Sequence, residues 1–185
     1  MYDSSEIRKG LKIEMGGDVY TIVEFQHVKP GKGGAFTRTK LKSLSRGAVV
    51  EKTFRSGEKL GKPDLQEKKM QFLYREGEQF HFMDEETYEQ TFLTEEQLGS
   101  SKEFLKENTT IDVLFHDNKP ISVELPTFVE IVIAKTDPGE RGDTVSGGTK
   151  PATLETGAVI QVPLFLNEGD MVKVDTRTGE YVERV

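Results

Sequence analysis

The sequence lacks cysteine and tryptophan, and only three of its 185 residues are histidines. Without cysteine, the chain has no disulfide bonds, no thiolate nucleophile and no thiolate metal ligand. The histidines, His27, His81 and His116, fall on different predicted elements, and none belongs to an HExxH pair. We therefore expect no catalytic dyad, no metal centre and no bound cofactor.

Other enzyme signatures are also missing. The spacing of Gly142 and Gly147 is that of a Walker loop, but Gly148 stands where the loop needs its lysine. The acidic clusters 84–86 and 95–96 lie at an expected turn and an expected helix start, where carboxylates cap backbone amides. These observations predict that the protein is not an enzyme.

Long apolar runs are absent as well. No run approaches the roughly 18 residues that a membrane span needs, and no basic amphipathic helix is present. No secretory signal precedes Ile7. The sequence predicts a folded cytoplasmic protein with no membrane partner.

Charge is distributed unevenly along the chain. Residues 1–62 contain 13 basic and 7 acidic residues, whereas residues 63–185 contain 12 basic and 25 acidic ones. No acidic residue lies between Phe25 and Val50, and that segment contains six basic residues: Lys29, Lys32, Arg38, Lys40, Lys42 and Arg46. Such a segment attracts a polyanion even though the net charge of the chain is −7. Nucleic acid, met by this end of the molecule, is the predicted partner.

The stretch "HVKPGKGGAF", residues 27–36, places Lys32 in a loop shaped by Pro30, Gly31, Gly33 and Gly34. Glycines on both sides remove side-chain bulk and allow a narrow tip with one cation. A solvated hairpin lysine is the simple interpretation. The basic residues Lys29, Arg38, Lys40, Lys42 and Arg46 favour RNA binding instead, because cations along a hairpin would follow phosphates.

Alternation with a period of two dominates the sequence and predicts an all-β fold of small barrels or a sandwich. Hairpins are expected with turns at 16–18, 75–78 and 117–120. In "FTRTKLKSL", Phe36, Arg38, Lys40 and Lys42 share one face, and the residues between them share the other. Pro163 predicts an edge strand or a bulge.

One helix is expected within residues 94–108, because Thr94 and Gln97 have capping-box spacing. Gly, Lys and Pro near residue 60 indicate a boundary, and a third block begins near Phe128. We predict domains at 1–63, 64–127 and 128–185. Blocks of about 60 residues are marginal alone, so each should rely on its neighbours.

Two stretches carry a family resemblance: "KPGKGGAFTRTKLKSL" and "KPATLETGAVIQVPLFLNEGDMVKVDTRTGEYVERV". The first resembles the modified-lysine loop of the bacterial elongation factor P family. The second resembles that family's carboxyl-terminal signature at six positions: Lys150, Ala152, Gly157, Val162, Pro163 and Gly169. With two distant motifs in register, the resemblance covers the whole chain.

The resemblance implies three β-barrel domains in an elongated L that mimics tRNA: an SH3-like (KOW-type) domain with the Lys32 loop, then two OB-folds, the first with one short helix. It implies a translation elongation factor that binds the 70S ribosome between the peptidyl and exit sites and relieves stalling at consecutive prolines. Lys32 falls on the tip lysine, which contacts peptidyl-tRNA and which a lysine-modifying enzyme lengthens in many members.

Further residues receive roles by the same resemblance. Gly142, Asp143 and Thr144 match a loop that faces the exit-site codon, and Tyr181 and Arg184 match ribosome contacts. The segment 99–101 departs from an acidic Gly-Asp-Asn loop of some relatives.

We hypothesise that the protein is a monomer that performs no chemistry itself and positions peptidyl-tRNA with the Lys32 loop. Two alternatives stay open: a general RNA-binding or RNA-chaperone protein of small barrels, and a specialised paralogue of the same family. The sequence also leaves open whether Lys32 is unmodified or carries a lysine-like or alkanol group, although Lys at this position disfavours rhamnosylation.

Overall fold

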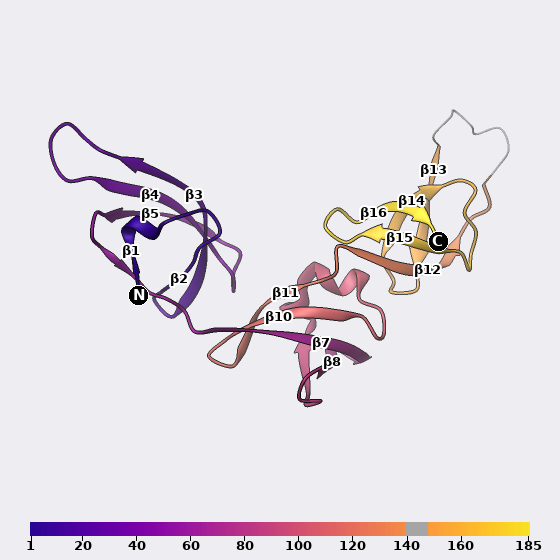
Figure 1. Cartoon of the computed structure of the whole chain (residues 1–185). Coiled ribbons are helices and arrows are strands. Elements are labelled where there is room, and N and C mark those ends of the chain that lie inside the picture. The colour runs from indigo at the N-terminus through magenta and orange to yellow at the C-terminus, as the bar shows by residue number, and fades with distance from the viewer. Residues whose placement is uncertain (140–147) are drawn as a thin grey trace. The chain divides into compact units, whose positions relative to one another are not determined.

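The computed structural model describes residues 1–139 and 148–185 and consists mainly of β-strands (Figure 1). The chain forms two compact units. Unit 1 comprises Met1–Glu67 and Leu114–Ser122, and unit 2 comprises Lys68–Val113 and Val123–Val185. The predicted all-β class is confirmed.

Unit 1 contains a four-stranded antiparallel sheet in the order β2-β3-β4-β5. Its strands are β2 (Lys12–Met15), β3 (Asp18–Val28), β4 (Phe36–Ser43) and β5 (Val49–Arg55). The predicted turn between β2 and β3 is confirmed at Gly16 and Gly17, whose φ angles of 61° and 79° favour glycine. The short strands β1 (Tyr2–Asp3) and β6 (Lys59–Leu60) pair with each other, and the 3₁₀ helix η1 (Ser4–Glu6) follows β1.

The alternation predicted for β4 is confirmed. Thr37, Thr39 and Leu41 are buried, whereas the basic side chains between them are exposed. Leu41 belongs to a buried cluster that fills unit 1: Ile7, Leu11, Ile13, Tyr20, Ile22, Leu41, Phe54 and Leu60. This core fixes which face of β4 points outward.

A five-stranded sheet follows, in the order β11-β10-β7-β8-β9. Its strands are β7 (Leu65–Glu76), β8 (Gln79–Asp84), β9 (Gln90–Thr94), β10 (Thr110–His116) and β11 (Lys119–Glu124). The β10–β11 turn consists of Asp117 and Asn118 alone, with φ angles of 49° and 63°. It is shorter than predicted, because Lys119 and Pro120 already belong to β11.

The predicted helix is present but short. Thr94 and Gln97 form the expected capping box at the start of α1 (Glu95–Leu98). Gly99, with a φ of 55°, ends this single turn, and the chain continues as the 3₁₀ helix η2 (Gly99–Phe104). The expected short helix is therefore confirmed within 94–108, and its α-helical part ends early because Gly99 lowers helix propensity where the chain must turn.

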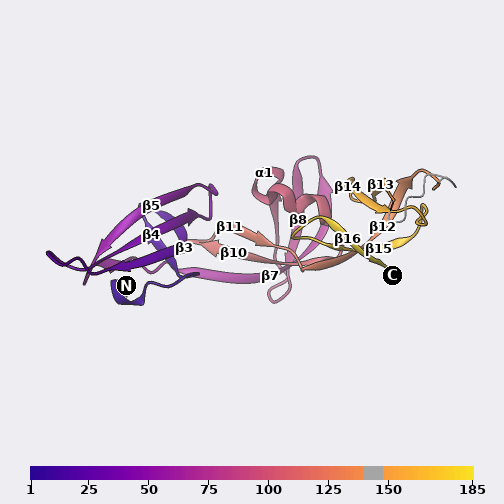
Figure 2. The same ribbon diagram turned by 90° about the horizontal axis from the view of Figure 1, so that it is seen from above.

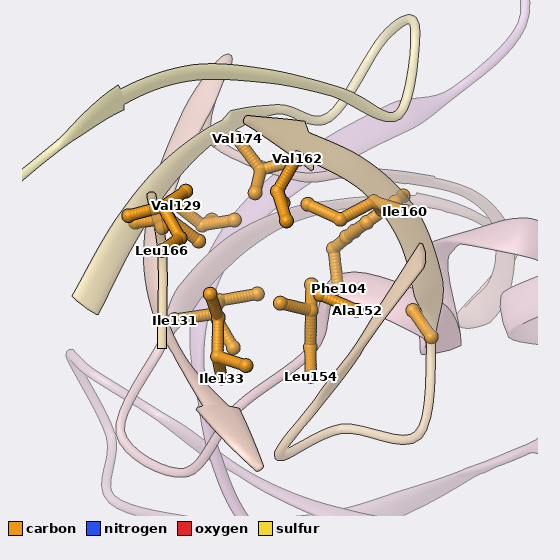
Figure 3. Packing of buried hydrophobic residues seen from close by; sticks show 12 residues of the cluster. Phe104, Val129, Ile131, Ile133, Ala152, Leu154, Ile160, Val162, Leu166 and Val174 are labelled. Atoms are coloured by element: carbon orange, nitrogen blue, oxygen red, sulfur yellow. The ribbon is translucent and has the colours of Figure 1, made fainter. Parts of the chain in front are cut away.

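The last sheet has the order β14-β13-β12-β15-β16. Its strands are β12 (Phe128–Thr136), β13 (Thr149–Leu154), β14 (Val159–Pro163), β15 (Met171–Asp175) and β16 (Glu180–Arg184). Pro163 lies on the edge strand β14, as predicted. Figure 3 shows the core of this last sheet, in which Phe104 of η2 packs with side chains such as Ile131 and Leu154.

Phe104 therefore couples the helical segment to the last sheet. It is 7% exposed, and Thr156 Oγ1 donates a hydrogen bond of 2.5 Å to the neighbouring Glu103 carbonyl. The last sheet is completed by a side chain from outside it, which agrees with the expectation that small blocks rely on neighbours.

Four strands were not predicted: β1, β6, β9 and β13. The first two have two residues each, and β13 contains Pro151, which weakens its strand pattern. In the described part of the chain the longest helical element has six residues, so no helix there could cross a membrane.

Candidate nucleic-acid interface

The loop between β3 and β4 extends beyond the paired strands of unit 1 (Figures 1 and 2), and Lys32 lies in the middle of this loop. The last pair of the ladder is Val28 with Phe36, and the residues between them are unpaired. Lys32 is exposed, and it makes no hydrogen bond or ion pair with any residue that the structure describes. Its amine is therefore available to a ligand.

The three glycines of this loop differ in what they contribute. Gly33 has a φ of 98°, a conformation that residues with a Cβ rarely adopt. Gly31 and Gly34 lack positive φ, and a Cβ at either would meet no other atom within 4 Å. Gly33 is therefore required by the backbone, whereas Gly31 and Gly34 keep the tip narrow. Pro30 is half-buried and Lys29 is exposed at the base of the loop.

Local contacts hold the base of the hairpin. His27 Nδ1 lies 2.8 Å from Thr37 Oγ1 across the strands. The rings of Phe25 and His27 meet edge to face at 5.3 Å, and the Arg38 guanidinium lies 5.4 Å from the centre of the Phe36 ring. These contacts restrict the hairpin below the loop, so Lys32 projects from an ordered support.

Arg38 and Lys42 have neutral neighbours across the sheet. Arg38 faces Gln26 on β3 and Thr53 on β5. Lys42 likewise faces a threonine on β3 and a valine on β5. Both side chains are exposed and carry charge that no adjacent acid offsets.

Lys40, between them, is different. It faces Glu24 on β3 and Glu51 on β5, and its Nζ lies 3.2 Å from Glu24 Oε2. The segment between Phe25 and Val50 contains no acidic residue, but strand pairing places acidic residues of β3 and β5 on both sides of Lys40. Since this pair is solvent-exposed, it weakens the field of Lys40 without removing it.

Arg46 lies at the other end of β4, away from Lys32. Its Nη2 donates to Tyr20 Oη at 3.0 Å and lies 3.4 Å from Asp18 Oδ2. Burial would raise the pKa of Asp18, but hydrogen bonds from the Ser43 and Ser45 hydroxyls and the adjacent Arg46 hold it below its usual value. The structure does not place Arg46 with the other basic residues.

A hollow of about 840 Å³ lies beside the basic strip of Arg38, Lys40 and Lys42. Phe25, which is 41% exposed, lines it together with Arg38 and Lys40. Lys9 and Lys52 also line this hollow, and an exposed ring beside cations can stack a base while the cations contact phosphates. Sequence reasoning missed Phe25, because a β-bulge between Ile22 and Glu24 pairs it with Thr39 and so places it on the face of the β4 threonines, opposite to Arg38 and Lys40.

The remaining predicted contacts lie in unit 2 or outside the described residues. Arg184 is exposed, with its guanidinium 5.7 Å from the centre of the exposed Phe165 ring. Tyr181 is half-buried and packs on the core of the last sheet. The segment 142–144 lies outside the described residues, and 99–101 forms the first half of η2.

A second aromatic group was not predicted. Tyr74, His81 and Phe92 lie on β7, β8 and β9, and the Tyr74 and His81 rings stack at 4.5 Å with an interplanar angle of 15°. Tyr74 and Phe92 are about half exposed. His81 pairs with Tyr74 on one side and with Phe92 on the other, and only the observed register brings the three side chains together.

Comparison with known families gives one consistent result. Residues 3–60 match the elongation factor P KOW-like domain, residues 65–123 its OB domain, and residues 129–184 its C-terminal domain. KOW-like and OB folds agree with the small antiparallel sheets described above.

Full-length relatives agree. The chain is 58% identical over 185 residues to an elongation factor P of Natranaerobius thermophilus, covering 100% of this chain and 98% of the relative. It is 54% identical to one of Pelotomaculum thermopropionicum, with both chains fully covered. A solved initiation factor 5A from Methanococcus jannaschii has a similar fold, with a TM-score of 0.59 and 21% identity over 68% of this chain and 92% of that one.

Proposed function

The chain belongs to the elongation factor P family of translation factors, which are not enzymes, and from this premise we propose that it binds the 70S ribosome between the peptidyl and exit sites. There it relieves stalling at consecutive prolines by positioning peptidyl-tRNA with the Lys32 loop. The observation that carries this proposal is the exposure of Lys32 at a narrow tip, without a partner among the described residues.

Positioning is a sufficient mechanism. A reacting group held in the correct orientation avoids the entropy lost in finding it, and each tenfold gain in rate needs about 1.4 kcal/mol. One or two charge-assisted hydrogen bonds from the Lys32 amine to the tRNA end supply this amount. The ribosome forms the bond, so the protein needs no nucleophile of its own.

Affinity comes from other residues. Arg38 and Lys42 contact phosphates, with Lys29 beside the loop and Lys40 as a weaker contributor because Glu24 lies 3.2 Å away. A factor that serves many tRNAs recognises RNA by shape and backbone. Arg46 adds less than the other cations, since it binds within unit 1.

The family premise also supports the finer assignments. We take the domains as 1–63, 64–127 and 128–185, with 142–144 facing the exit-site codon and Tyr181 and Arg184 contacting the ribosome. The protein acts as a monomer in the cytoplasm. An exposed Lys32 is accessible to a lysine-modifying enzyme, and the intact mass of natively expressed protein determines whether a group is added.

The decisive experiment times translation of a reporter with three successive prolines, with and without the protein, beside a reporter that lacks them. We expect the protein to accelerate only the first, and Lys32→Ala to abolish the acceleration. A rate unchanged by the wild-type protein refutes the proposal.

One observation favours a second candidate, a general RNA chaperone: two separate groups of exposed aromatics lie on strands, one around Phe25 and one of Tyr74, His81 and Phe92. A chaperone would accelerate annealing of complementary RNA strands and leave the proline reporter unchanged.

A further inference from the structure

His116 is the last residue of β10, and it is only 8% exposed. Its Nε2 is buried and makes no hydrogen bond of acceptable geometry to any residue in the described chain. Buried polar atoms without such a bond are uncommon and need an explanation.

Two carboxylates lie beside this nitrogen. Glu14 of β2 places Oε1 at 3.2 Å from Nε2, and Asp117 of the β10–β11 turn places Oδ2 at 3.6 Å. One atom from each of the three residues can be chosen so that all lie within 4.8 Å of one another. Glu14 is half-buried and Asp117 is exposed, so the group opens to solvent on one side.

The two separations from His116 Nε2, 3.2 and 3.6 Å, match those between metal ligands. Bonds of about 2.0–2.1 Å in a tetrahedral site place neighbouring ligand atoms roughly 3.3 Å apart. A simple His–Glu hydrogen bond needs the nitrogen's proton to point at the carboxylate, and the observed geometry does not provide that. A cation needs to lie along the Nε2 lone pair, but the carboxylate oxygen does not, because the oxygen can approach the cation from another direction.

We propose that Glu14, His116 and Asp117 bind one divalent transition-metal ion, with Zn²⁺ as the best match and a water as the fourth ligand. Imidazole with carboxylates suits zinc and its first-row neighbours, whereas Mg²⁺ and Ca²⁺ prefer oxygen ligands alone. The site lies within unit 1, and it joins β2 to the distant β10–β11 turn. A bound ion fixes this turn against β2.

The sequence predicted no metal centre, because the histidines are scattered and unpaired in the chain. The ligands come together only through the fold: Glu14 lies opposite Val19 in β2–β3, far along the sequence from His116. The signal for this site was therefore not available in local spacing.

A matched control exists in the same chain. His81 Nε2 is also buried without a hydrogen bond, and it lies 3.4 Å from Glu76 Oε2. No third acidic or histidine ligand joins this pair among the described residues. His81→Gln therefore removes a comparable histidine–carboxylate pair without affecting the proposed site.

The test is calorimetric titration of untagged protein with ZnCl₂. We expect one ion per chain, with affinity lowered about tenfold or more by His116→Gln and unchanged by His81→Gln. Asp117→Asn is a second variant, because asparagine tolerates the left-handed backbone of the turn and preserves its shape. Unchanged zinc affinity in both His116→Gln and Asp117→Asn, or equal weakening by His81→Gln, overturns the proposal.

Hydrogen exchange gives an independent readout. Zinc should slow exchange of the backbone amides in residues 114–122 of the wild-type protein and of His81→Gln, and should have no effect in His116→Gln. Mg²⁺ at the same concentration should leave exchange unchanged. Equal protection by Mg²⁺ contradicts an imidazole-dependent site.

Discussion

The basic strip of β4 gives a quantitative prediction, because its three cations differ in their neighbours. We consider separate replacement of Arg38, Lys40 and Lys42 by Gln, which removes one charge each from exposed positions. Only Lys40 has acids across the sheet, with Glu24 at 3.2 Å. We therefore expect Arg38→Gln and Lys42→Gln to weaken ribosome binding more than Lys40→Gln.

The magnitude follows from counterion release. Each phosphate contact contributes about 0.7 to the slope of log affinity against log salt. A variant that loses one contact should therefore have a slope smaller by about 0.7. Between 50 and 200 mM salt, its affinity should fall about 2.5-fold less than the affinity of the wild-type protein. The Lys40–Glu24 pair is worth about 0.2–1 kcal/mol at this exposure. Glu24→Gln should therefore tighten binding by roughly 1.4- to 5-fold, and by less in a Lys40→Gln background.

The assay is fluorescence anisotropy of labelled protein titrated with 70S ribosomes at several KCl concentrations. Lys135→Gln is a charge-matched control, because Lys135 is exposed on β12, outside the strip. This prediction would be contradicted if Arg38→Gln and Lys40→Gln changed the salt slope equally and Glu24→Gln did not raise ribosome affinity. Such a result would show that the acids across the sheet do not weaken phosphate binding by the basic strip.

Three further predictions concern stability. Phe104→Ala should lower the free energy of unfolding by about 3–5 kcal/mol in urea titration, and Phe104→Leu by much less, because Phe104 fills the core of the last sheet. Equally small decreases in the free energy of unfolding for both variants would contradict that packing. Gly61→Ala should cost about 1–3 kcal/mol in the same assay, since its Cβ would lie 2.5 Å from the Glu14 carbonyl oxygen, and an unchanged midpoint would refute the clash. The hydrogen bond from Lys59, followed by that from the Ser5 amide, lowers the pKa of Asp3 to about 2. The resulting stability is present above about pH 4 and is lost as the pH falls toward 2, so thermal melts of Asp3→Asn should approach wild type over that range, and a constant difference would contradict it.

Local signals in the sequence were sufficient for much of the fold. Gly16 and Gly17 predicted a turn because few other residues adopt its angles, and the alternation of β4 predicted which face carries the cations. Thr94 and Gln97 correctly predicted the start of α1. In each case the residues that determine the structure are neighbours in the chain.

The features that escaped prediction depend on residues far apart in sequence. Glu24 and Glu51 meet Lys40 only through strand pairing, and the bulge in β3 decides that Phe25 pairs with Thr39 and not with Arg38. Phe104 enters a core formed by later strands. Side-chain spacing does not contain this information, because register and packing are set by the whole sheet.

The most direct test of the central claim separates binding from activity at Lys32. Anisotropy with 70S ribosomes and timing of the three-proline reporter are measured for Lys32→Ala, with Lys29→Ala as the matched loop control. If Lys32 positions tRNA while other cations anchor the protein, Lys32→Ala binds within about twofold of wild type but gives the rate seen without the factor. Loss of binding in proportion to the loss of rate would contradict the account.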